Sequence, residues 1–200
     1  VPADNGALSF SKRLEQYFAS AIKRKLTMSI SLYDLSVTNY LQILGSTSAV
    51  LDKGKEYAKS KGIELSTLVD TRLAEDMAPL RFQIISTAHH SLGAINGIKA
   101  GVFGPPYNAD ELDYDGLHGL VKGAIDALGK VSADEINALE GGDMRFEMGD
   151  FVLPFTAEGF IHSFSLPNFF FHATTTYDIL RMKGVPLGKM DFLGAMQVKG

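Results

Sequence analysis

Apolar residues recur every three or four positions along most of the chain, and polar residues fill the positions between them. Spacing of this kind places the apolar side chains on one face of an α-helix, where neighbouring elements can bury them. We therefore expect four long helices joined by short links, over residues 32–61, 79–100, 109–128 and 157–183.

Residues that commonly begin or end helices mark several of these boundaries. Gly62 follows a lysine and is a suitable stop for the first helix. Ser31 and Thr156 are suitable N-caps for the first and fourth helices. Pro79 is acceptable in the first turn of the second. Residues 66–77 then form a short helical or irregular link.

Two further segments lack helical spacing. Apolar and polar residues alternate over 144–148 and partly over 151–153, on either side of Gly149-Asp150, which predicts a small β-hairpin. Residues 185–200 have no strong period, and we expect them to cover part of the helical surface. The whole pattern indicates an all-α fold, an up-down four-helix bundle with a hairpin before the last helix.

The first 27 residues differ from the rest. Residues 8–22 combine apolar residues at helical spacing with a basic opposite face. Three interpretations are open: an added amphipathic helix, a mitochondrial-type presequence or an artificial tail. Glu15 argues against the presequence. We therefore divide the chain into an N-terminal extension, residues 1–27, and a helical domain, residues 28–200.

Composition narrows the class of protein. Of 200 residues, 46% are hydrophobic and 21% charged, which indicates a globular domain. The net charge of -4 gives no indication of nucleic-acid binding. The absence of cysteine excludes disulfides, thiolate nucleophiles and cysteine-ligated metals. No apolar run is long enough for a membrane span and no signal peptide is visible, so we expect a cytoplasmic protein.

The fourth predicted helix carries a polar stripe among its apolar residues. At about 100° per residue, the members of this stripe share one face, bracketed by isoleucines. Buried polar groups need hydrogen-bonding partners. The stripe therefore predicts a polar pocket that holds a small ligand or water, lined by Ser165, Asn168, His172, Thr175 and Thr176.

Pro167 lies within the same helix. Because proline has no N–H, the carbonyl of Ser163 loses its helical partner. We expect either a kink at this point or two shorter helices that meet there.

The five histidines are the other candidates for chemistry. His89 lies at the edge of the apolar stripe of the second helix and is expected to point inward, whereas His90 points more outward. His118 is expected to face solvent, and His162 lies about 80° around the helix from His172. A buried histidine in a bundle is either a hydrogen-bonded core residue or a ligand, and both interpretations of His172 stay open.

Several runs of the chain resemble a known family. Residues 28–33 look like its usual start, 76–83 like its second-helix opening, 166–181 like its most distinctive run, and 184–194 like its tail. Over residues 28–195 the chain thus resembles an uncharacterised microbial domain-of-unknown-function family, DUF 1993, which is similar to the DinB/YfiT-like superfamily. The resemblance implies an up-down helical bundle, often homodimeric.

The resemblance also implies a candidate metal site. Superfamily members often hold a divalent metal with one histidine from the second helix and two, four residues apart, from the fourth. Here the latter pair corresponds to Asn168 and His172, so an asparagine replaces one histidine. The metal ligands would then be His89 or His90 together with His172, a weak set for zinc or nickel.

Three hypotheses of function follow. The first is a binding module whose polar pocket around Asn168 and His172 holds a small ligand; it is favoured because no complete catalytic motif occurs. The second is a divalent-metal-dependent enzyme of DinB type, a thiol transferase or hydrolase, which Asn168 argues against. The third is a homodimeric structural or interaction protein.

Overall fold

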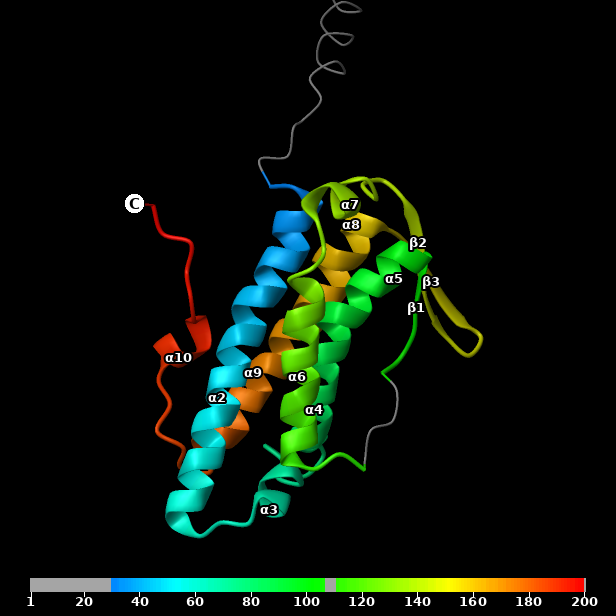
Figure 1. Cartoon of the computed structure of the whole chain (residues 1–200). Helices are drawn as coiled ribbons and strands as arrows, with labels where there is room; N and C mark the ends of the chain where they lie inside the picture. The colour runs from blue at the N-terminus through cyan, green and yellow to red at the C-terminus, as the bar shows by residue number, and fades with distance from the viewer. Residues whose placement is uncertain (1–29, 107–110, 200) are drawn as a thin grey trace, which may run out of the picture. The chain divides into compact units, whose positions relative to one another are not determined.

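The computed structural model of the protein describes residues 30–106 and 111–199. Residues 32–200 form one compact unit. This unit is mostly helical and contains a small three-stranded sheet (Figure 1). The mostly helical class expected from the sequence is confirmed, and the interpretations of residues 1–27 lie outside the described residues.

Four long helical segments occur where the apolar spacing predicts them, and three of them contain a π-helical turn, labelled η. In chain order the segments consist of η1 (Asp34–Thr38) with α2 (Asn39–Lys61); α4 (Leu80–Ala88), η2 (His89–Gly93) and α5 (Ala94–Ala100); α6 (Tyr114–Leu128); and α8 (Ala157–Phe160), η3 (Ile161–Ser165) and α9 (Leu166–Met182). Shorter helices are α3 (Leu65–Val69), α7 (Ala133–Asn137) and α10 (Lys189–Leu193).

The long segments pack against one another around a common core. Helix α2 contacts α6 and α9, and α4 also contacts α6 and α9 (Figure 1). The largest fully buried side chains come from all four segments, among them Tyr40, Ile84, Tyr114 and Phe169. Burial of such side chains contributes about 1.5–3 kcal/mol each, so this core is the main source of stability.

The ends of the helices have identifiable causes. Gly62 ends α2 in the left-handed conformation, with φ 63°, as predicted. At the other end of that segment, the N–H groups of Leu32 and Tyr33 donate to the side chains of Glu140 and Asn137, at 3.5 and 2.9 Å. The first helix is thus capped by residues more than 100 positions away, which local sequence patterns do not reveal.

The third long helix begins later than the predicted position 109. It begins at Tyr114, because the side chain of Asp113 accepts a hydrogen bond from the N–H of Gly116 at 2.8 Å and caps the helix there. Residues 107–110 lie outside the described part of the chain. The fourth segment begins as expected, with Thr156 accepting from the N–H of Gly159.

The predicted hairpin is confirmed and belongs to a sheet. Strand β2 (Asp143–Met148) pairs antiparallel with β3 (Phe151–Thr156), and Gly149 adopts a φ of 59° in the turn. Strand β1 (Val102–Phe103) pairs parallel with β2. Two residues are too short for a visible alternation, so the sequence did not predict β1.

The helix continues through Pro167 by way of a π-helical turn. The N–H of Leu166 donates to the carbonyl of Ile161, five residues back, directly before the proline. The widened turn accommodates Pro167, whose nitrogen carries no hydrogen and cannot donate a hydrogen bond. The predicted irregularity at Pro167 therefore takes the form of η3.

The C-terminal segment packs on α2 through α10. The side chain of Gln42 donates to the carbonyl of Leu193 at 2.8 Å, and Lys53 pairs with Asp191 at 2.6 Å. This agrees with a segment that covers the helical surface. In the described ranges, 30–106 and 111–199, no helix is long and apolar enough to cross a membrane.

Candidate functional site

The polar stripe of the fourth segment lies on a helix-to-helix contact. Ser165, His172, Thr175 and Thr176 are buried, whereas Asn168 is half-buried. Helix α9 packs along α4, which adds buried polar side chains of its own, namely Gln83, Ser86 and Thr87, followed by His90 and Ser91 in η2. Two polar faces thus meet where hydrophobic packing would be the norm.

The tautomer of His172 is fixed by Gln83. The amide nitrogen of Gln83 donates to the carbonyl of Ala78 at 2.8 Å, so its oxygen Oε1 faces the Nδ1 of His172, also at 2.8 Å. The Nδ1 atom must carry the proton, which leaves Nε2 with a free lone pair. Burial lowers the pKa of His172 to about 4, so the ring is uncharged at neutral pH.

His90 lies at the centre of a row of three histidines. Its ring centroid lies 5.5 Å from that of His89 and 5.7 Å from that of His172, and the His90 and His172 rings are nearly parallel. The Nδ1 atom of His90 is buried and has no hydrogen-bond partner within the described ranges of the chain. Burial, followed by the neighbouring His89 and His172, lowers the pKa of His90 to about 3.

The expectation that His90 points more outward than His89 is wrong. His90 is buried, with 7% of its surface exposed. His89 is half-buried, and its Nε2 lies 2.8 Å from the carbonyl of Gly104, to which it donates. Five consecutive residues of α4, Gln83 to Thr87, are buried because the helix packs on both α9 and α6. The apolar stripe of the sequence therefore did not predict which side chains of this helical segment point inward.

The other members of the stripe have separate partners. The hydroxyl of Ser165 donates to the carbonyl of His90 and contacts the Tyr40 hydroxyl, each at 2.7 Å. The side chains of Asn168 and Thr175 donate to carbonyls of their own helix, those of Phe164 and Phe171. Asn168 and His172 share no direct hydrogen bond. Two buried hydroxyls, Ser86 Oγ and Thr176 Oγ1, have no partner among the described residues.

The residues present do not complete a zinc or nickel site. His172 is suited to ligation, because a partner on Nδ1 orients Nε2. However, the amide nitrogen of Asn168 donates to the Phe164 carbonyl, which leaves its amide oxygen as the possible ligand, and oxygen ligands of this kind suit zinc and nickel less well than imidazole does. Within residues 30–106 and 111–199, no group of three or more His, Cys, Asp or Glu side chains could hold a metal ion. Two imidazoles alone fall short of the usual three or four protein ligands.

A groove of about 410 Å³ lies beside His89, on the side of α6. His89, Leu92, Asn96 and Leu120 line it together with glycines and alanines, whereas His172 does not. The volume is in the range of small-molecule sites. Its position differs from that of the pocket expected around Asn168 and His172.

The expectation for His118 is also wrong. His118 is 4% exposed, and its Nε2 lies 2.8 Å from the Ser48 hydroxyl. Its position, four residues after Tyr114 and three before Val121, follows the apolar spacing of α6 and would have predicted burial. His162 is exposed and does not join His172.

Comparison with known proteins agrees with this architecture. No curated protein matches the chain. The crystal structure of a DinB family member protein from Shewanella denitrificans, at 1.83 Å resolution, is similar with a TM-score of 0.70 and 25% sequence identity, over 92% of this chain and 98% of that one. The profile of the family "Domain of unknown function (DUF1993)" matches residues 32–193. The chain therefore belongs to the DUF1993 family and has a DinB-like fold.

Proposed function

We propose that the protein is a binding module that holds a small ligand at His90 and His172. The observation that carries this proposal is the buried Nδ1 of His90, which has no partner in the described part of the chain and lies next to a second uncharged imidazole with a free nitrogen. A buried polar atom without a partner costs about 1–3 kcal/mol. A ligand that pairs with this atom would recover that free energy.

The surroundings favour a small uncharged molecule with both a polar and an apolar part. The unpaired hydroxyls of Ser86 and Thr176 offer further hydrogen bonds on the same two helices. The rings of Phe82 and Phe171 contact His172 edge-on and are themselves exposed, so they offer an apolar approach to it. A charged ligand would be disfavoured, because both imidazoles are neutral at pH 7.

Native mass spectrometry of the freshly purified protein tests the proposal. We expect a bound mass that is released on denaturation. His172→Asn keeps a donor for Gln83 but removes Nε2, and His90→Gln removes Nδ1; both variants should lose the bound mass. His162→Asn, an exposed position on the same segment, is the matched control. A bound mass that survives both site substitutions, or no bound mass in the parent protein, would contradict the proposal.

A divalent-metal-dependent enzyme of DinB type, a thiol transferase or hydrolase, is the second candidate. The hydrogen bond from His172 to Gln83 favours it, because it presents Nε2 as a metal ligand. Elemental analysis of untagged protein purified without chelator distinguishes the two. About one zinc or nickel per chain, lost in His172→Asn, would support this candidate. A metal-free protein after incubation with either ion would exclude it.

Homodimerisation is the third candidate role. Large apolar side chains are exposed on the hairpin and on α9, including Phe151 and Phe171. Burial of such side chains between two copies would favour association. We expect light scattering to give the mass of two chains, and Phe171→Glu to shift the distribution toward one. A single-chain mass at micromolar concentration would contradict a dimer.

A further inference from the structure

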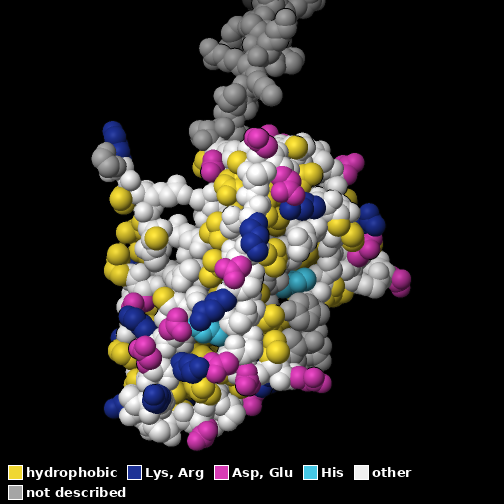
Figure 2. All heavy atoms as spheres, viewed as in Figure 1, with side chains coloured by type: hydrophobic (Ala, Val, Ile, Leu, Met, Phe, Trp, Pro, Cys, Tyr) yellow, Lys and Arg dark blue, Asp and Glu magenta, His cyan; other side chains and the backbone are white. Residues whose placement is uncertain are grey.

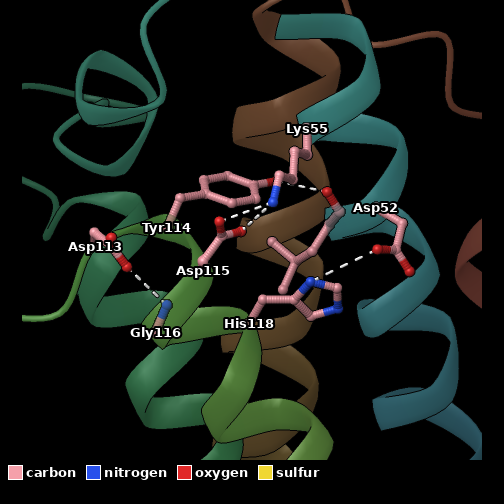
Figure 3. A network of polar contacts seen from close by, with 8 residues as sticks. Asp52, Lys55, Asp113, Tyr114, Asp115, Gly116 and His118 are labelled. Atoms are coloured by element: carbon pink, nitrogen blue, oxygen red, sulfur yellow. Dashed lines mark hydrogen bonds and ion pairs between the residues drawn. The ribbon is translucent and has the colours of Figure 1, made fainter. Parts of the chain in front are cut away.

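A second polar cluster lies where α2 packs against α6. It contains a serine, a histidine and an aspartate in the order in which such groups activate a serine hydroxyl. The Oγ of Ser48, on α2, lies 2.8 Å from the Nε2 of His118, on α6. The other ring nitrogen, Nδ1, lies 3.7 Å from a carboxylate oxygen of Asp52, one turn after Ser48 (Figure 3). A hydroxyl, an imidazole and a carboxylate thus follow one another in space.

The charges around the ring determine which nitrogen carries the proton. The Asp52 carboxylate favours a proton on Nδ1, although 3.7 Å is longer than a direct hydrogen bond. Nε2 then has a free lone pair and accepts the hydroxyl proton of Ser48. This is the arrangement of nucleophile, base and orienting group that nucleophilic catalysis requires.

The imidazole is uncharged at neutral pH and can therefore take up a proton. Burial lowers the pKa of His118, and Lys122 and Lys55 act in the same direction. Asp52 and Asp115 act in the opposite direction.

Lys55 is already paired with Asp115, at 2.7 and 2.8 Å, as Figure 3 shows. Lys122 is exposed, lies one turn after His118 on α6 and acts on its pKa, so it offers a cation near the ring.

A reactant can approach Ser48 from solvent. Ser48 is half-buried, Ala49 is exposed, and a side-chain carbon built on Gly45, one turn earlier, would meet no atom within 4 Å. Figure 2 shows that charged side chains and histidine side chains are both visible on the face in view. Ser48 and Asp52 therefore lie at an open surface, with the buried ring of His118 behind them.

We propose that Ser48 is an acyl-accepting nucleophile toward small activated carboxylic esters, with His118 as its general base. The Ser48 oxygen forms a bond to the ester carbonyl carbon while its proton passes to Nε2 of His118. The carbon–oxygen bond to the leaving group then breaks, and the proton passes from Nε2 to the departing oxygen. The products are an acyl-Ser48 ester and an alcohol or phenol, and water can later hydrolyse the ester by the reverse proton transfers.

The environment restricts the substrate to esters with good leaving groups. Ser48 lies inside α2, where the backbone N–H groups are engaged in helical hydrogen bonds, so they cannot form an oxyanion hole. The negative charge that develops on the carbonyl oxygen would be stabilised by the ammonium group of Lys122. The open surface favours small acyl groups such as acetyl.

Incubation with 4-nitrophenyl acetate, followed by peptide mass spectrometry, tests the proposal. We expect an acetyl group on Ser48 that hydroxylamine removes, unlike the stable amides formed on lysines. Ser48→Ala should abolish this signal. Ser60→Ala should keep it, because Ser60 is an exposed serine of the same helix whose hydroxyl donates only to the carbonyl of Tyr57.

The role of His118 as general base is tested by measuring the rate of Ser48 acetylation. His118→Gln retains an acceptor for the Ser48 hydroxyl but cannot take up its proton, so we expect the acetylation rate to fall about 100-fold or more. In the parent protein the rate should fall at acidic pH, where His118 becomes protonated, and Asp52→Asn should shift this fall to lower pH, because the Asp52 carboxylate raises the pKa of His118. No acetyl-Ser48, or equal rates with His118→Gln and no pH dependence in the parent protein, would overturn the proposal.

Discussion

Gln83 determines the chemistry available to His172, since its amide fixes which ring nitrogen is protonated. We predict that Gln83→Glu raises the pKa of His172, because a carboxylate beside Nδ1 stabilises the charged ring. An NMR titration of the ring protons of His172 in the parent protein and in the variant measures this. An unchanged pKa of His172 would mean that residue 83 does not face its ring in solution.

The buried histidines also predict how stability depends on pH. Burial holds the pKa of His90 near 3 and that of His172 near 4, against 6.5 in the unfolded chain. Between pH 6.5 and 4 the unfolded chain binds more protons, so the free energy of unfolding falls as the pH falls. Between pH 6.5 and 5, the free energy of unfolding falls by about 1.5 kcal/mol for each of His90 and His172.

Urea denaturation at pH 7 and pH 5 measures this loss. The burial-lowered pKa values of His89 and His118 act in the same direction. In the His90→Gln variant the difference between the two pH values should shrink. An unfolding free energy that stays constant over this range would show that the rings are hydrated in solution.

The sequence predicted some residues of the site but not all. Burial of Ser165, His172 and Thr176 followed from the angle of 100° per residue on one helix. The inward orientation of His90 could not be predicted in this way, because the preceding helix α4 is buried on several sides and its polar residues meet those of α9. The Gln83 partner was also missed, since contacts between residues 89 positions apart leave no local pattern.

Helix α2 lies close to α6 at Gly54. A side-chain carbon at this position would lie 2.5 Å from the Tyr114 hydroxyl, which is buried and donates to the carbonyl of Leu51 at 2.8 Å. We predict that Gly54→Ala lowers the free energy of unfolding by about 1–3 kcal/mol, through overpacking. Urea denaturation measures the change.

Gly45 provides the matched control on the same helix. It is exposed, and an added carbon there would meet no atom within 4 Å. Gly45→Ala should raise stability by up to about 1 kcal/mol, because alanine favours the helix. Equal effects of the two substitutions would contradict the close approach at Gly54.

Length decided which elements the sequence predicted. The long helices and the hairpin span enough residues for a period to be visible. Strand β1 has two residues, and α7 and α10 have five each, so their periods cannot be seen. For α7 a signal did exist: Ser132 caps the helix and Glu135 follows three residues later, the spacing of a capping box.

At the scale of the whole molecule, the packed core begins at Leu32, which is fully buried. The bonds from Leu32 and Tyr33 to Glu140 and Asn137 fix the start of the first long helix without residues 1–27. We predict that deletion of residues 1–27 leaves a cooperative thermal transition, measured by circular dichroism at 222 nm (about the minimum of an α-helix). Loss of a cooperative transition would show that the extension is needed for folding.

The three π-helical turns have an evolutionary consequence. Each holds one more residue than an α-helical turn would, so each is equivalent to a single-residue insertion within a helix. A relative without the insertion at residues 89–93 would keep the helix and the directions of the side chains beyond that point, because the wider turn absorbs the extra residue locally, and only the side chains within the turn would change direction. Insertion or deletion of one residue thus offers this family a way to exchange the histidine that faces α9 while the fold stays the same, and alignments of its members should allow one-residue gaps inside these helices.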